Sequence, residues 1–354
     1  MIDTAVLREV PGILSAEDIA ESAAFLAALQ LPSGLIAWTP GGHADPWNHV
    51  EAAMALTITG HIDAAKQAYQ WLARSQSRDG SWFHYYVGEW VSSRRIDTNV
   101  CAYIATGLLH YLTVTGDLEF VRSLWPTLEQ AINFVVARQR PDGALAWSMS
   151  DSGSTEKEAL LTGSSSAFLS LRCALELADI LGHARSSWQV AAARLGHTLR
   201  CHPTAFADKN TFAMDWYYPV LAGVVRGSSA AARIDEGWTT FVRDEGVRCV
   251  HTNEWVTAAE TAECVLALDA VGDRERARAL FATTTAHRVT GGGYLTGWVY
   301  PQHVTFPTDE CTSYSVAAVL LAADAITGST PGAALFRHTS RPAITEVTSG
   351  CCEA

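Results

Sequence analysis

Two carboxylates in the sequence stand near tryptophans, in settings where a carboxyl group could act as an acid or a base. Asp45 lies in residues 41–47, a Gly-Gly-His-Ala-Asp-Pro-Trp segment close to Trp38, and Glu260 follows Trp255 near the start of an apolar segment. Cleavage of a glycosidic bond usually uses one protonated and one ionised carboxyl group. We therefore expect Asp45 and Glu260 to be the catalytic pair.

The surroundings of each carboxylate suggest its role. Thr257, Glu260 and Glu263 recur at i, i+3 spacing, so they share a helix face that we expect to look into the protein. Burial there would raise the pKa of Glu260, as a general acid requires. Asp45 also has a plain structural interpretation, because Asp before Pro46 is a favourable helix N-cap.

Other carboxylates compete for these roles. Asp97 and Asp309 stand at equivalent distances before two repeated glycines, which would place them at similar depth. Asp97 is expected to bind sugar hydroxyls with Arg94 and Asn99, and Glu310 is a second choice for the base. Glu156 and Glu158, in a Ser- and Gly-rich loop, are weaker candidates, expected to be solvated.

Aromatic and polar residues are interleaved around these carboxylates. Aromatic rings cover the C–H faces of sugars, while amides, imidazoles and carboxylates bind hydroxyls. Most of the 12 tryptophans lie in these segments, which suggests several sugar subsites and internal cleavage. The expected substrate-binding residues are Trp38, His43, Trp47, His84, Tyr85, Arg94, Asp97, Asn99, Trp147, Asp215, Trp216, Tyr217, Trp255, Trp298, Glu310 and Tyr314. For Trp147, the alternative is that it packs a loop onto the helix ends.

Composition narrows the partners. The formal net charge of −12 argues against nucleic acid and anionic membranes, because phosphates would be repelled. No apolar run is long enough to span a bilayer, and the N-terminus lacks the pattern of a secretory signal. The 8 cysteines are scattered without a CxxC pair, which favours a reducing cytoplasm and no metal. We expect a sugar polymer as partner and no cofactor.

Six repeated glycines predict the scaffold that holds these residues. Each glycine follows an apolar, Ala- and Leu-rich helix, and a polar residue then starts an amphipathic one. Glycine takes the left-handed conformation that ends a helix at little cost. The six are Gly60, Gly116, Gly182, Gly227, Gly272 and Gly328.

This alternation predicts two layers of helices. A helix that is apolar on all sides is buried, whereas one with a polar stripe faces solvent. The unpaired amphipathic helix predicted at 16–30 can fill the last outer position. We therefore expect an all-α fold, an (α/α)6 toroid closed by the N-terminal helix, in one domain over 1–341 with an irregular tail at 342–354. An open helical solenoid is the alternative.

A second repeat marks the long loops between hairpins. It reads Gln-x-x-(Ser/Asp)-Gly and leads to a Trp at residues 30–34, 76–80 and 139–143. These loops leave from the end of the helices opposite the glycine turns. Function concentrates on loops that a rigid scaffold holds, so we expect the site at this end.

Two families resemble the sequence. The segment 76–82 and the run Asp309-Glu310-Cys311 look like protein prenyltransferases and triterpene cyclases, which are also helical toroids. That resemblance implies an isoprenoid enzyme, with zinc held by Asp309, Cys311 and a His such as His338, His43 or His49.

Along the whole chain, the rhythm of 97–143 and 257–312 resembles six-hairpin glycosidases of the glucoamylase-like kind. More narrowly, the chain is similar to actinobacterial hydrolases of methylmannose polysaccharides. This resemblance implies an endo-acting α-1,4-mannan hydrolase in the cytoplasm, without a metal. A third interpretation is a sugar-binding or epimerase-like toroid that does not hydrolyse its ligand.

Overall fold

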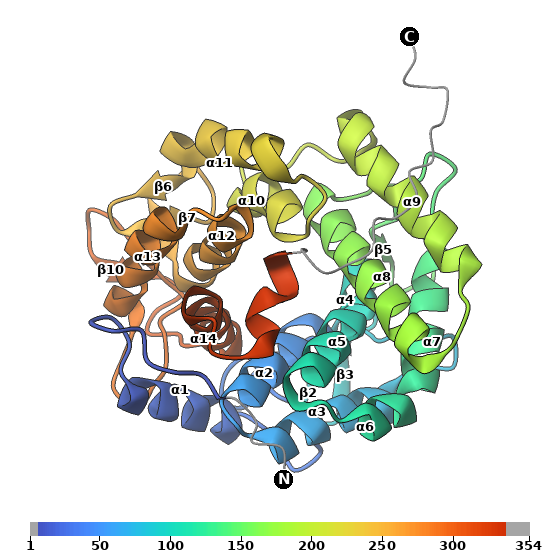
Figure 1. The fold of residues 1–354 in the computed structure, drawn as a ribbon, viewed down its shortest axis with the longest axis horizontal. Helices are drawn as coiled ribbons and strands as arrows, with labels where there is room; N and C mark the ends of the chain where they lie inside the picture. Colours follow the sequence, from blue (N-terminus) through green and yellow to red (C-terminus); the bar gives the residue numbers. More distant parts are fainter. Residues whose placement is uncertain (1–5, 338–354) are drawn as a thin grey trace.

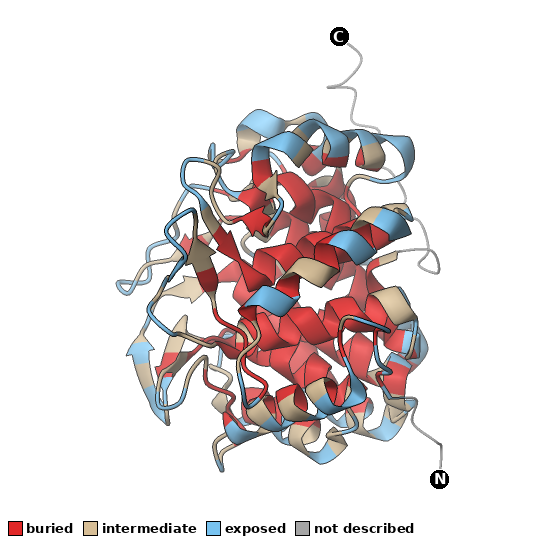
Figure 2. Cartoon of the chain, turned by 90° about the vertical axis from the view of Figure 1, so that its left-hand side faces the viewer, coloured by how far each residue is buried: buried red, intermediate tan, exposed pale blue. Residues whose placement is uncertain are grey.

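The computed structural model describes residues 6–337, which form two layers of helices (Figures 1 and 2). The inner helices are largely buried, and the outer ones carry the exposed residues. The inner helices are α2 (Pro46–Ile58), α4 (Thr98–Ala102) with α5 (Ile104–Thr115), α8 (Leu161–Leu181), α10 (Ala213–Leu221), α12 (Ala258–Val271) and α14 (Ser313–Thr327). The outer helices are α1 (Ala16–Ala28), α3 (Ile62–Ser75), α6 (Leu118–Ser123) with α7 (Trp125–Val136), α9 (Ser186–Cys201), α11 (Gly227–Phe241) and α13 (Arg274–Thr283).

Each inner helix packs against the next one in the chain. Contacts run from α2 through α5, α8, α10 and α12 to α14, and α14 in turn contacts α2. The apolar character of α14 on every side explains its place, because almost all of its residues are buried. The predicted inner layer is therefore confirmed.

The outer helices present one apolar face to this layer. In α3, Ala65, Tyr69 and Leu72 are buried, while the opposite face is accessible. The amphipathic segment at 118–136 is divided into α6 and α7, because Pro126 lies in the first turn of α7 and lacks an N–H group.

Left-handed glycines end four inner helices as predicted, at Gly116, Gly182, Gly272 and Gly328. The expectation for Gly227 is wrong. There α10 already ends at Leu221, the left-handed turn falls on Gly223, and Gly227 begins α11. Gly223 is the first glycine after α10, and it can adopt the left-handed conformation that ends the helix there at little cost.

The fold is mostly helical, but the expectation of an all-α protein missed short strands in the long loops. They form three antiparallel sheets, in the orders β1-β2-β3, β4-β5 and β10-β9-β8-β7-β6. Each has two to four residues, too few for an alternating pattern to be visible in the sequence. They are β1 (His43–Ala44), β2 (Tyr85–Val87), β3 (Trp90–Ser93), β4 (Ile96–Asp97), β5 (Ser148–Met149), β6 (Val242–Arg243), β7 (Gly246–Arg248), β8 (Trp255–Thr257), β9 (Gly297–Val299) and β10 (Val304–Thr305).

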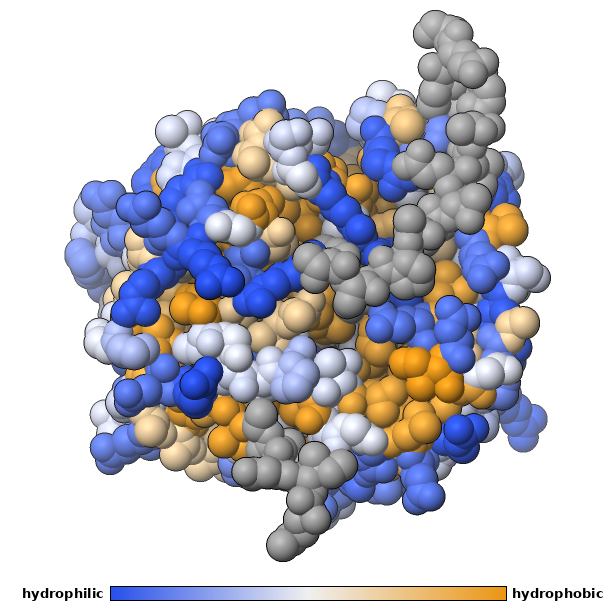
Figure 3. Space-filling view, viewed as in Figure 1, coloured by the Kyte–Doolittle hydropathy of each residue, from blue (hydrophilic) through white to orange (hydrophobic). Residues whose placement is uncertain are grey.

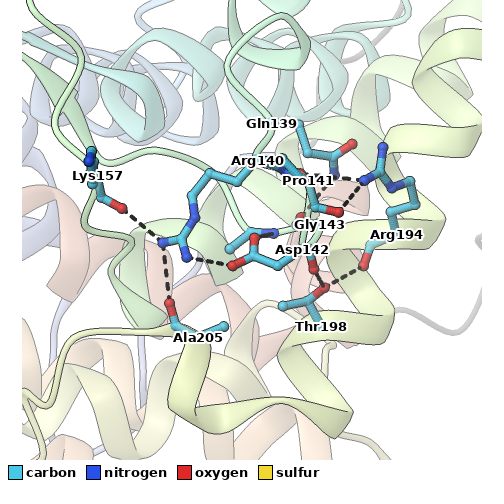
Figure 4. Close-up of polar contacts among 10 residues, drawn as sticks. Gln139, Arg140, Pro141, Asp142, Gly143, Lys157, Arg194, Thr198 and Ala205 are labelled. Atoms are coloured by element: carbon cyan, nitrogen blue, oxygen red, sulfur yellow. Dashed lines mark hydrogen bonds and ion pairs between the residues drawn. The ribbon is translucent and has the colours of Figure 1, made fainter. Parts of the chain in front are cut away.

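The Gln-x-x-(Ser/Asp)-Gly repeat attaches each long loop to the following outer helix (Figure 4). In all three copies the Gln amide donates to the carbonyl of its own loop glycine at 2.9–3.0 Å. The same amide donates to a carbonyl next door, of Ala64, Thr127 or Ala191, at 2.8–2.9 Å. The repeat therefore has a structural role that positions the loops.

The glycine of each copy lies directly against that neighbouring helix. A Cβ atom on Gly34 would lie 2.3 Å from the carbonyl oxygen of Gln67, and one on Gly80 2.2 Å from that of Gln130. Gly292 repeats this relationship with α1, where a Cβ would lie 2.3 Å from the carbonyl oxygen of Glu21. The loop after α13 thus packs against α1 in the same way as earlier loops pack against α3 and α7.

Three 3-10 helices complete the described chain, η1 (Pro203–Ala205), η2 (Thr284–His287) and η3 (Pro331–Arg337). In Figure 1, η3 (red) lies across the middle of the ring of helices, and it contacts α5, α12 and α14. Arg337 donates to Asp269 at 2.7 Å. The predicted tail, 342–354, lies outside the described residues. Hydrophilic side chains predominate around the periphery in the same view (Figure 3).

A search of residues 6–337 finds no single helix with the length and hydropathy to cross a membrane. Only α14 and η3 taken together pass that test, with a bend of 96° between them.

Candidate active site

Asp45 is the N-cap of α2, and its carboxylate also faces aromatic residues. Its Oδ1 accepts from the backbone N–H of Asn48 at 3.0 Å, as an N-cap does. Its Oδ2 accepts from Trp38 Nε1 at 2.7 Å and from Asn48 Nδ2 at 2.6 Å. With 4% of its surface exposed, this carboxylate is held in place by three donors.

Imidazole and aromatic rings gather beside Asp45. The His43 ring lies 4.8 Å from Trp38 and 4.5 Å from Tyr85, and His84 lies 4.1 Å from Tyr85, all between ring centroids. Pairing of β1 with β2 brings these two loops together. Four of the predicted binding residues are therefore assembled next to the predicted catalytic Asp45.

Asp97 occupies an equivalent place on the next hairpin, as N-cap of α4. It accepts from the backbone N–H of Asn99 at 2.8 Å and from Trp147 Nε1 at 2.6 Å. Pairing of Asp97 with Ser148 across β4 and β5 sets the position of Trp147, and Arg95 lies 4.1 Å above its ring. Burial raises the pKa of Asp97, which the positive charge of His84 partly offsets.

Glu260 lies in the first turn of α12 and is 8% exposed. It accepts a hydrogen bond from the hydroxyl of Thr257, the last residue of β8, as the shared helix face predicts. The thiol of Cys249 is a second neighbour, whose pKa is raised by burial and then by the charge of Glu260. The predicted acid is thus almost buried, with a hydroxyl as its donor.

Two further carboxyl groups, Glu51 and Glu263, lie deeper between the inner helices. Tyr103 Oη donates to Glu51 Oε1 at 2.9 Å, and Tyr217 Oη donates to Glu263. Burial raises the pKa of Glu51 to about 8. Burial, followed by the charge of Glu51, raises the pKa of Glu263 well above its usual range. The raised pKa values favour the neutral form of both groups.

Tyr314 connects the two sides of this arrangement. Its ring lies 6.2 Å from Trp38 and 6.1 Å from Trp47, on the side of Asp45. Burial, then the charges of Glu263 and Glu260, raise the pKa of its phenol, which places it near the carboxylates of α12. We call Asp45, Glu51, Asp97, Glu260 and Glu263, with the rings around them, the carboxylate cluster.

Several buried polar atoms at this end have no hydrogen-bond partner among the described residues. Buried polar atoms in proteins are nearly always paired, so such a concentration suggests that a ligand supplies the partners. These atoms come from the starts of α2, α4 and α14. They are Trp47 Nε1, Asn48 Oδ1, Glu51 Oε2, Asn99 Oδ1 and Ser313 Oγ.

Asp215 and Trp216 point away from the carboxylate cluster. The Trp216 ring stacks on Phe241 of α11 at 5.3 Å, and its Nε1 donates to the carbonyl of Arg233. Asp215 accepts from the Thr162 hydroxyl at 2.5 Å. Only Tyr217 of this predicted trio contacts a carboxylate of the cluster.

Four other predicted binding residues lie in the surrounding loops. Trp255 and Trp298 donate to the carbonyls of Phe306 and Ala286, Glu310 accepts from Thr296, and Arg94 lies over Phe83. The expected equal depth of Asp97 and Asp309 is wrong. Asp97 is buried, whereas Asp309 sits in an exposed turn with a left-handed backbone (φ 52°).

The zinc site implied by the prenyltransferase resemblance does not form in residues 6–337. No three His, Cys, Asp or Glu side chains there gather as metal ligands. Cys311 packs instead against Gly293, 3.2 Å from where a Cβ atom would stand. His338 lies outside the described residues.

Tyr103 and Tyr218 have no assigned role in the prediction from the sequence, and Glu263 appears there only as a neighbour of Glu260. The Trp47 ring contacts both tyrosines, at 5.6 and 6.1 Å. The available signal was a carboxylate inside an apolar helix, since Glu51 is 4% and Glu263 2% exposed.

No family model matches the chain. The chain is 46% identical over 334 residues to the MMP endo-(1,4)-3-O-methyl-alpha-D-mannosidase of Mycolicibacterium hassiacum, across 94% of this chain and 92% of that protein. The chain belongs to the family of this mannosidase. The match spans most of both chains, and the prenyltransferase alternative is not supported.

Solved structures share the fold of this chain at low sequence identity. An α-amylase from Clostridium perfringens is similar with a TM-score of 0.65 and 12% identity, over 86% of this chain and 97% of that one. A glycosidase variant in complex with glucose gives 0.67 and 14%, over 90% and 100%. D-mannose isomerase gives 0.67 and 11%, over 88% and 96%. One fold therefore serves hydrolysis and isomerisation of sugars.

Proposed function

We propose that this chain is an endo-acting hydrolase of α-1,4-linked methylmannose polysaccharide, with Asp45 and Glu260 as its catalytic pair. The observation that carries the proposal is the carboxylate cluster at the starts of the inner helices, in a chain of the mannosidase family. Cytoplasmic location and independence from metals and cofactors remain predictions from the sequence.

We also propose the finer architecture on which the site depends, a closed (α/α)6 toroid in one domain over 1–341. Packing of α14 against α2 supports closure of the inner layer. The approach of Gly292 to Glu21 supports α1 as the last outer helix. An open solenoid would leave both of these contacts unmade.

The hydrogen bonds favour a division of labour between the two carboxyl groups. Asp45 receives three N–H donors, which suit an ionised carboxylate acting on the anomeric carbon or on a water beside it. Glu260 is nearly buried and receives one hydroxyl, which suits a general acid that protonates the leaving oxygen. One water is consumed for each bond cleaved.

The remaining groups would bind and orient the sugar. Trp38, Trp47 and Tyr314 offer ring faces, and the unpartnered atoms of Asn48 and Asn99 offer acceptors for hydroxyl groups. Glu51 and Glu263, whose neutral forms burial favours, offer polar contacts at the base of the cluster. A neutral polyhydroxylated ligand fits this chemistry.

The test is incubation with a defined α-1,4-linked oligosaccharide of 3-O-methylmannose, followed by mass analysis of products. We expect shorter oligosaccharides whose masses sum to the substrate plus one water. Asp45→Asn and Glu260→Gln should each lower kcat by about 10²–10⁴-fold, the range for loss of a general acid or base. Full activity in both variants, or no cleavage of any α-linked manno- or gluco-oligosaccharide, would overturn the proposal.

The same assay separates hydrolysis from isomerisation, for which the fold shared with D-mannose isomerase is the reason to look. An isomerase returns a product of unchanged mass and consumes no water. A product of that kind from a monosaccharide, with oligosaccharides left intact, would favour the second function.

A further inference from the structure

A cavity of about 650 Å³ lies between α8, α9 and the turn that joins α10 to α11. No member of the carboxylate cluster lines it, so it is separate from the candidate active site. Its apolar walls include Phe168 of α8 and Leu199 of α9. Its volume is that of a site for a small organic molecule.

Four arginines line this cavity, namely Arg172, Arg200, Arg226 and Arg233, and its described lining contains no Asp or Glu. The concentration is unexpected in a chain with a formal net charge of −12. Glu176 lies one turn beyond Arg172 on α8 but is not part of the described lining. The walls of the cavity therefore bring cationic groups together in an acidic protein.

Arg172 is the key member, because the two terminal nitrogens of its side chain are buried without a hydrogen-bond partner. The residue is 4% exposed, and neither Nη1 nor Nη2 finds an acceptor among the described residues. Its guanidinium group lies 5.9 Å from the Phe168 ring, which supplies no counter-charge. A buried guanidinium in this state is costly unless an anion completes it.

Backbone carbonyls orient a second guanidinium, that of Arg233. It donates to the carbonyls of Asp215 and Trp216 at 2.6 and 2.7 Å. Such carbonyls hold a guanidinium in place without cancelling its charge. Burial lowers the pKa of Arg233, partly offset by the charges of Asp215 and Glu236, as expected for a cation removed from water. The Nε of Arg226 also donates to a backbone carbonyl of the lining, that of Gly223, at 2.9 Å.

We propose that this cavity binds a small molecule that carries a phosphate or carboxylate group, with Arg172 as the central ligand. Guanidinium groups form two parallel hydrogen bonds to such oxyanions. Ser229, also in the lining, adds a hydroxyl donor, and the apolar walls accommodate the body of the ligand. This proposal does not depend on the glycosidase proposal, because its test measures binding of an anion to the cavity and not cleavage of a sugar.

The test uses the full chain and two probes, inorganic phosphate and acetate, titrated calorimetrically in the low millimolar range against chloride at equal ionic strength. Wild-type protein should bind one equivalent of at least one probe and show a saturable rise in Tm. Phosphate without acetate identifies a phosphate ligand, and binding of both identifies a general oxyanion site. Binding of neither probe overturns the proposal.

Arg172→Met keeps the contact with Phe168 but removes the charge, so affinity should fall at least tenfold. Its Tm in chloride should equal or exceed that of the wild type, because a buried unpartnered cation is gone. Arg274→Met makes the same chemical change at an exposed position and should leave binding intact. Should Arg172→Met fail to fold, Arg226→Met, at an exposed position, should lower affinity severalfold. Unchanged affinity in the folded variants refutes the site.

Discussion

The phenol of Tyr103 on the inner layer donates to Glu51 Oε1 across 2.9 Å, and the two residues come from neighbouring hairpins. Burial raises the pKa of Glu51 to about 8, from an ordinary value of 4.5. The folded protein therefore keeps this proton at pH values where the unfolded chain has released it. Because the folded-state pKa is raised, stability is lost as pH rises from about 4.5 to about 8.

Glu51→Gln keeps a neutral group at this position, so the pH-dependent loss should disappear. Between pH 5 and pH 8, the free energy of unfolding of the wild type should fall by about 2–4 kcal/mol relative to the variant. Urea unfolding at several pH values measures this difference. Glu275→Gln, on the exposed face of α13, is the control and should run parallel to the wild type. A parallel curve for Glu51→Gln would contradict the assignment.

The two roles of Asp45 are separable by substitution. Asparagine keeps a side-chain oxygen for the N–H of Asn48 but turns an amide N–H₂ toward the Trp38 and Asn48 side-chain donors, so Asp45→Asn should cost about 1–3 kcal/mol of stability. Asp45→Ala also loses the N-cap and should cost about 1 kcal/mol more. Both variants should be nearly inactive. Denaturant unfolding and kcat, measured together, check this. If kcat falls only in proportion to the loss of stability, and not with loss of the carboxylate, Asp45 acts only as an N-cap.

Trp38 positions Asp45 through its indole N–H, at 2.7 Å from Oδ2. Trp38→Phe keeps an aromatic ring but loses this donor, and we expect kcat to fall about tenfold, the effect of losing about 1.4 kcal/mol in the transition state. Trp188→Phe loses an indole bond to Asn133 Oδ1 between α9 and α7, away from the cluster, and should leave kcat unchanged. Equal effects of the two substitutions would refute a positioning role.

Gly80 is predicted to be necessary for stability and not for chemistry. Gly80→Ala would place Cβ 2.2 Å from the Gln130 carbonyl oxygen, in a left-handed conformation (φ 92°). Gly182→Ala requires a similar conformation (φ 79°) but has open space around the new Cβ. Gly80→Ala should therefore be about 1–3 kcal/mol less stable than Gly182→Ala. Urea unfolding tests this, and kcat of the folded fraction should be unaffected in both.

The inner helices could be predicted because their apolar character extends around the whole helix. Asp45 and Asp97 could be selected as candidate site residues because tryptophans in the loops accompany them. The same signal gave the wrong position for the Trp216 side chain. The sequence pattern of a tryptophan at a helix start is the same whether its ring faces the lumen or, as here, α11. Glu51 and Glu263 carried one local signal, a carboxylate inside an apolar helix, but their role depends on hydrogen bonds from Tyr103 and Tyr217 of other hairpins. Contacts of that range are fixed by packing and leave no short-range pattern.

The contact of Gly292 with Glu21 joins the beginning of the described chain to its last third. During synthesis, α1 leaves the ribosome first and finds the loop that holds it only after more than two hundred further residues have emerged. The first few hairpins would therefore present an unfilled edge until the loop that contains Gly292 has been synthesised. Closure of the fold is therefore a late event, and chains truncated before this loop should expose apolar surface that chaperones bind.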